Sequence, residues 1–107
     1  MTETPEVLVT VTRYEVSLLP EGHRARCHFT ITVEHRGGAS WAVLDGPFCL
    51  GLDGDWEYEP LPSNRTDEWI STHRFDLKTA LELAKQAAPR VTVNGCTAAE
   101  VYHRTRT

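Results

Sequence analysis

Cysteine and histidine are the side chains of this chain that could do chemistry, as thiolate nucleophiles, general bases or metal ligands. The chain has three cysteines and five histidines: Cys27, Cys49, Cys96, His23, His28, His35, His73 and His103. None of them form a pair at the close spacing of a zinc site, and Cys27 and His28 are neighbours, which a strand would point to opposite faces. We therefore expect no metal site and no cofactor.

A thiol nucleophile would be built from Cys49 or Cys96, with His73 brought to it by the fold as a base. No signature surrounds these residues, and the chain lacks serine-hydrolase, phosphate-loop, dinucleotide and zinc-protease motifs. Glu57 and Glu59 are paired carboxylates, but acid–base catalysis needs two environments that differ. We expect a protein that is not an enzyme, and a small hydrolase using His73 ranks last among the alternatives.

Residues 45–68 are the most unusual part of the chain, because they contain seven acids and one base, Arg65. The only tryptophans, Trp41, Trp56 and Trp69, flank or interrupt this run. Aromatic and acidic residues interleaved in one segment favour a surface that recognises an unidentified protein with a basic face. The predicted partner-binding residues lie within 53–69: Asp53, Asp55, Glu57, Glu59, Arg65, Asp67, Glu68 and Trp69. The simpler interpretation is ordinary solvation of a hairpin and its turn.

The tryptophans also have a structural interpretation. Trp41 and Trp56 fall on the apolar faces of predicted strands and are expected in the core or partly buried. Trp69 lies in a predicted loop, residues 60–72, with a helical turn at 66–70; it either caps the core edge or is an exposed anchor. Arg65 precedes Trp69 by four positions, so the two could stack as a cation–π pair on one helical turn.

The length of 107 residues fits one domain, with a flexible tail at residues 1–6 and a single domain at 7–107. The net charge of −4 argues against binding to bulk nucleic acid. The second hypothesis is nevertheless a nucleic-acid-associated regulator that uses the 23–26 turn and the C-terminus, through Arg24, Arg26, Arg104 and Arg106. No membrane span, signal peptide or disulfide pattern is apparent, so we expect a cytoplasmic protein; self-association is compatible with the sequence.

The first half of the chain predicts antiparallel strands. Residues 7–19 form a long strand-like run whose alternation changes phase near Thr12-Arg13, which indicates a bulge or two strands. Residues 26–36 alternate strictly and form the clearest strand; Gly37-Gly38 closes a turn before a third strand at 41–44.

Asp53-Gly54 predicts a hairpin between residues 48–52 and 56–59. A three-residue loop pairs Leu52 with Trp56 and Leu50 with Tyr58. This register is preferred because it gathers the apolar residues on one buried face: Phe48, Leu50, Leu52, Trp56 and Tyr58. Glu57 and Glu59 then face solvent.

The second half predicts helices. Asp76 is an N-cap for an amphipathic helix that ends at Pro89. A short strand at 90–93 follows, and Thr97 with Glu100 forms a capping box for a last helix. The predicted fold is α+β: an antiparallel β-meander of four to five strands with one main helix packed on one face, then a short strand and a short C-terminal helix.

The segment of residues 41–101 also resembles a family of short, uncharacterised proteins found in actinobacteria and their phages. The residues that carry the resemblance are Trp41-Ala42-Val43, Asp53-Gly54, Trp56-Glu57-Tyr58-Glu59, Pro62-Ser63, Arg65, Glu68-Trp69, His73-Arg74-Phe75-Asp76-Leu77, Ala80-Leu81 and Ala88-Pro89-Arg90-Val91-Thr92-Val93-Asn94-Gly95. The resemblance implies a prokaryotic or phage cytoplasm and transfers no catalytic or binding residue.

Overall fold

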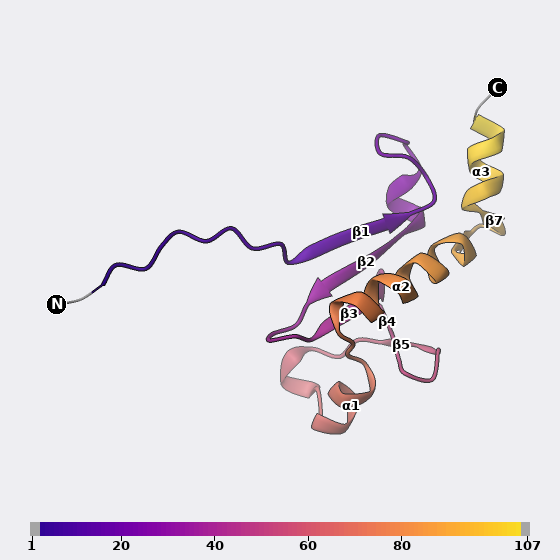
Figure 1. Cartoon of the computed structure of the whole chain (residues 1–107). Helices are drawn as coiled ribbons and strands as arrows, with labels where there is room; N and C mark the ends of the chain where they lie inside the picture. Colours follow the sequence, from indigo (N-terminus) through magenta and orange to yellow (C-terminus); the bar gives the residue numbers. More distant parts are fainter. Residues whose placement is uncertain (1–2, 106–107) are drawn as a thin grey trace.

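A five-stranded antiparallel meander forms the body of the protein in a computed structural model that describes residues 3–105. The strands follow chain order, each paired with the next: β1 (Arg13–Ser17), β2 (Thr30–His35), β3 (Trp41–Asp45), β4 (Phe48–Leu50) and β5 (Trp56–Tyr58). Figure 1 shows helix α2 (Leu77–Ala87) lying across this sheet. The predicted α+β fold is confirmed.

Helix α2 forms because its cap and its apolar stripe agree. The Asp76 carboxylate accepts a hydrogen bond of 2.8 Å from the Thr79 backbone N–H, as predicted for an N-cap. Ala80 and Ala84 are fully buried and let the helix approach the sheet closely. The main core between helix and sheet consists of Ile31, Val33, Trp41, Val43, Leu50, Phe75, Ala80, Ala84 and Ala88.

The C-terminal part adds a small hairpin and a helix. Strands β6 (Thr92–Val93) and β7 (Cys96–Thr97) pair through Asn94 and Gly95, whose φ angles of 53° and 80° suit a tight hairpin turn. The sequence predicted only the first of these strands. Helix α3 (Ala98–Thr105) begins at the predicted capping box, in which Glu100 and Thr97 bond each other's backbone N–H groups.

Two predicted strands are shorter in the structure. Residues 3–12 are exposed and form no strand, so the run predicted over 7–19 begins only at Arg13, where the alternation changes phase. The strand predicted from residue 26 begins at Thr30, and Arg26–Phe29 is a 3-10 helix with Cys27 exposed. Thr30 faces Ser17, the last residue of β1, so the preceding residues have no strand to pair with. Residues 1–2 of the predicted tail and 106–107 of the predicted domain lie outside the described residues.

The register predicted for the Asp53-Gly54 hairpin is wrong by two residues. Leu50 faces Trp56 and Phe48 faces Tyr58, which leaves a five-residue loop at 51–55. Leu52 leaves the ladder because its backbone N–H donates to the Thr72 carbonyl at 2.8 Å, a contact from a distant segment. The shift is even, so the residues on each strand face are the predicted ones.

Among residues 3–105, no helix has both the length and the apolar character needed to cross a membrane.

Candidate interaction surface

The apolar face of hairpin β4–β5 is only partly covered. Helix α2 packs over β1, β2 and β3, and β4–β5 extends beyond it. Leu50 is buried, but Phe48, Trp56 and Tyr58 on the same face keep exposed fractions of 46%, 37% and 68%. Phe48 and Tyr58 meet edge to face, with ring centroids 6.1 Å apart. The prediction that this whole face is buried is wrong, because the one main helix is too narrow to cover five strands.

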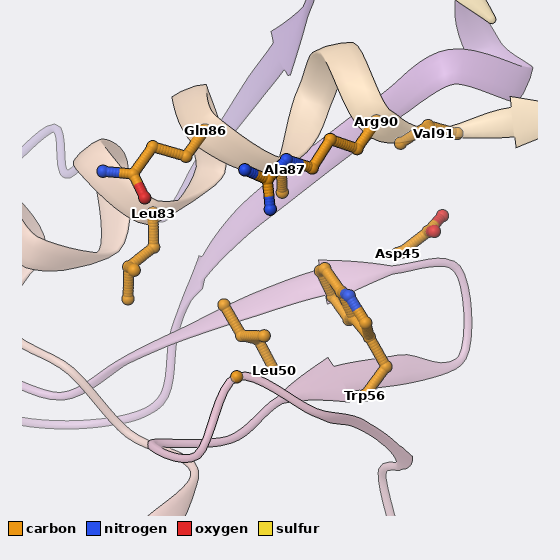
Figure 2. A pocket seen from close by; sticks show the side chains of 9 residues that line it. Asp45, Leu50, Trp56, Leu83, Gln86, Ala87, Arg90 and Val91 are labelled. Carbon is orange, nitrogen blue, oxygen red and sulfur yellow. The ribbon is translucent and has the colours of Figure 1, made fainter.

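A groove separates the uncovered hairpin from α2. It has a volume of about 210 Å³, and Figure 2 shows Leu50 and Trp56 on one side with Leu83 and Ala87 on the other. Asp45 and Val91 lie at one end of the groove, and the Arg90 side chain reaches from that end back toward Ala87. Partial burial raises the pKa of Asp45 above its ordinary value. The groove therefore presents apolar walls with one carboxylate and one guanidinium at its rim.

Strand β5 is also an edge of the sheet. Gly51 donates to the Asp55 carbonyl and Glu59 donates to the Pro47 carbonyl, so the backbone groups of residues 55, 57 and 59 face β4. The backbone groups of Trp56 and Tyr58 consequently point away from the sheet. This edge offers hydrogen-bonding groups beside exposed aromatic side chains.

Five of the six acidic residues of 53–69 form two exposed sets. Asp53, Asp55 and Glu57 lie on the hairpin, where Asp53 also accepts from the Asp55 backbone N–H at 3.0 Å and shapes the turn. Asp67 and Glu68 lie in the first turn of α1 (Asp67–Thr72), a position that the helix dipole favours for carboxylates. The Leu52–Thr72 hydrogen bond joins the two segments at one end of the molecule.

Glu59 and Arg65 lie in a partly buried cluster instead. The Glu59 carboxylate meets Arg36 at 2.8 Å, Arg74 at 3.2 Å and Arg65 at 3.5 Å. Burial opposes ionisation of Glu59, but the Arg36 hydrogen bond and the charges of Arg36, Arg65 and Arg74 outweigh it and lower the pKa. The hydrogen bond to Glu59 likewise raises the pKa of Arg36. The cluster fastens the ends of β2 and β5 to the loop before α1, which makes it a support for the hairpin.

Trp69 caps the edge of the core. Its ring stacks on His73, with centroids 4.0 Å apart and planes 3° apart, and it packs on Ala42, Leu44 and Cys49. The guanidinium over its ring belongs to Arg74, at 5.3 Å, and not to Arg65 as the spacing suggested. Arg65 precedes the start of α1, so the two residues do not share a helical turn.

His73 is buried at 5% exposure beneath the hairpin loop. Its Nδ1 lies 2.8 Å from the Trp69 carbonyl oxygen, and since a carbonyl only accepts, Nδ1 carries the proton in this contact. Its Nε2 is 3.5 Å from a Glu57 carboxylate oxygen and lies against Gly51, where an added Cβ would approach it to 3.2 Å. His73 therefore serves as packing between α1 and the loop.

The residues considered for catalysis are not arranged as a thiolate–imidazole pair. Cys49 is fully buried, and burial raises its pKa to about 11, so the thiol stays protonated. Its sulfur meets the main-chain carbonyl of His73 at 3.8 Å and not the ring. The sulfur of Cys96 is 3.6 Å from an Arg104 nitrogen. Within residues 3–105, no three His, Cys, Asp or Glu side chains converge as metal ligands.

The basic residues of the nucleic-acid hypothesis come from two segments that pack on one small core, since Ala25 of the turn and Val101 of α3 both lie against Leu19, Phe29 and Ala98. Arg26 is partly buried and approaches Glu15 at 3.9 Å, whereas Arg24 is exposed on the preceding turn. Arg104 lies at the far end of α3, and Arg106 is outside the described residues.

Comparison with models of known protein families, with curated proteins and with solved structures finds no match for this chain. The resemblance to short actinobacterial and phage proteins therefore stays a prediction.

Proposed function

We propose that this protein is a small non-enzymatic binding domain that engages a protein partner through the hairpin surface. This name denotes Phe48, Trp56 and Tyr58 together with the groove between β5 and α2. The proposal rests on one observation: the aromatic face of β4–β5 is exposed and lies beside an acidic loop. The partner's contact would be an apolar segment flanked by lysine or arginine.

Interface physics supports this choice. Large aromatic side chains provide most of the binding energy at protein interfaces when they become desolvated. Exposed large apolar residues gather in the hairpin, the loop after it and α1: Phe48, Leu52, Trp56, Tyr58, Leu61 and Ile70. Asp53, Asp55 and Glu57 on the same hairpin give a negative field that would steer a basic partner.

The proposal revises the surface suggested by the sequence. Asp53, Asp55 and Glu57 remain contact residues, and Asp67 and Glu68 flank them at α1. Glu59, Arg65 and Trp69 become supports, because they contact other parts of this chain. The resemblance noted above would give the partner a prokaryotic or phage cytoplasmic setting, as for an accessory factor of a phage or mobile element.

Site-specific photo-crosslinking tests the proposal. A photoreactive phenylalanine analogue replaces Tyr58, and in a control it replaces Lys78, an exposed residue on α2 away from the groove. We expect a discrete adduct from position 58 that weakens when Trp56→Ser is added, and no such adduct from position 78. Equal adducts from both positions, or none from position 58, would contradict the proposal.

A further inference from the structure

Residues 3–12, here called the arm, contain apolar side chains that no other part of the described chain covers. Figure 1 shows the arm running on from β1 and away from the body, and the molecule measures 65 Å along its longest axis against 34 and 22 Å along the others. Val7 and Val9 are each 96% exposed, Leu8 is 80% exposed and Val11 is 55% exposed. β-branched residues at every second position, on an extended chain, are typical of a strand that has a neighbour.

The arm continues β1 in register. The His35 N–H donates to the Thr12 carbonyl at 2.9 Å, which extends the β1–β2 ladder by one residue. Backbone groups of even-numbered residues from Thr12 onward therefore face β2. Those of Arg13, Glu15 and Ser17 face outward, because β1 is at the edge of the sheet opposite β5. The outward edge thus begins at β1 and continues along the arm.

We propose that two copies of this chain associate by antiparallel pairing of residues 7–17, so that the arm of each copy adds to β1 of the other. A two-fold axis near Thr12, perpendicular to the joined sheet, places outward-facing residues of one copy opposite outward-facing residues of the other. Val11 then lies across from Arg13 of the second copy, Val9 from Glu15 and Val7 from Ser17.

The side-chain faces and the charges favour a second copy as the occupant. Leu8 falls across from Val16 of the second copy, which packs at the edge of the main core. The arm carries Glu3 and Glu6 and no base. Antiparallel pairing directs this acidic end past Ser17 of the second copy toward the turn that carries Arg24 and Arg26. A parallel neighbour would direct it the opposite way.

This contact is independent of the hairpin surface. It uses the β1 edge, and β5 with its groove lies at the other edge of the sheet. A dimer would therefore carry two hairpin surfaces. Failure of the pairing would leave the proposed function standing, and failure of the function would leave the pairing standing.

Sedimentation velocity from about 1 to about 100 µM tests the pairing, since a dimer depends on protomer concentration. We expect the mass of two 12.1-kDa chains for the wild type. Val9→Pro removes an outward N–H and should raise the dissociation constant of the dimer by roughly ten-fold or more. Thr10→Pro removes an N–H on the side without a partner, so it should change that constant by less than about three-fold. Neither residue contacts the core, so circular dichroism should report the same fold for both variants.

A wild-type chain that stays monomeric at the highest concentration would overturn the proposal. Equal weakening by Val9→Pro and Thr10→Pro would overturn the backbone register, and assembly beyond two copies would overturn the two-fold arrangement.

Discussion

Glu59 links the end of the hairpin to three other segments of the chain. Its carboxylate forms ion pairs with three arginines. Arg36 follows β2, Arg65 lies in the loop before α1, and Arg74 follows His73. Arg36 and Arg74 lie 23 and 15 residues from it in the sequence, so no local pattern could reveal the cluster. The sequence instead predicted that Glu59 faces solvent. Strand alternation predicts on which face a side chain lies, but not which distant segment packs against that face.

Glu59→Gln should lower the free energy of unfolding by about 2 kcal/mol near neutral pH, because it removes the carboxylate from three partly buried guanidinium groups. The lowered pKa makes the contribution of Glu59 complete above the ordinary value of 4.5 and lost as the pH falls through the folded-state value. The difference in free energy of unfolding between wild type and variant, measured with urea, should therefore be constant above the ordinary value of 4.5 and shrink as the pH falls below it.

Glu57→Gln is the matched control. Its side chain is 52% exposed, so the free energy of unfolding should change by about 0.5 kcal/mol or less. A Glu59→Gln effect as small as that of the control would show that the cluster is not a support.

At the scale of elements, the parts that could be predicted are those specified by neighbouring residues. Helix α2, its Asp76 cap and the capping box of α3 follow from local spacing, and the structure confirms each. The predicted hairpin register was wrong because the Leu52 N–H donates to the Thr72 carbonyl, twenty residues later in the chain. The uncovered aromatic face could not be predicted either, since alternation indicates an apolar face but not whether a helix reaches it.

The close approach of α2 to the sheet depends on small residues. Ala84→Leu should lower the free energy of unfolding by about 2 kcal/mol, because Ala84 has no exposed surface and the added atoms must displace the helix. Glu82→Leu, at an exposed position of the same helix, should change it by about 0.5 kcal/mol or less. Thermal or urea unfolding of the two variants makes the comparison, and equal stabilities would argue against tight packing of α2.

At the scale of the whole molecule, the sheet ends in two edges of different character. The β1 edge continues into the arm and is suited to pairing with an identical strand. The β5 edge is short, aromatic and close to acidic residues, which suits a different protein with a basic, apolar contact. The sequence pointed to the second region through its composition, and only the fold separates the proposed contact residues from the residues that support them.

The most direct test of the binding proposal is the affinity of the protein crosslinked at position 58 for wild type, Tyr58→Ala and Lys78→Ala. Titration calorimetry should give a dissociation constant roughly ten-fold or more weaker for Tyr58→Ala and nearly unchanged for Lys78→Ala. Because Tyr58 is 68% exposed, the melting temperatures of all three proteins should agree. Equal affinities of Tyr58→Ala and wild type would contradict the hairpin surface as the binding site.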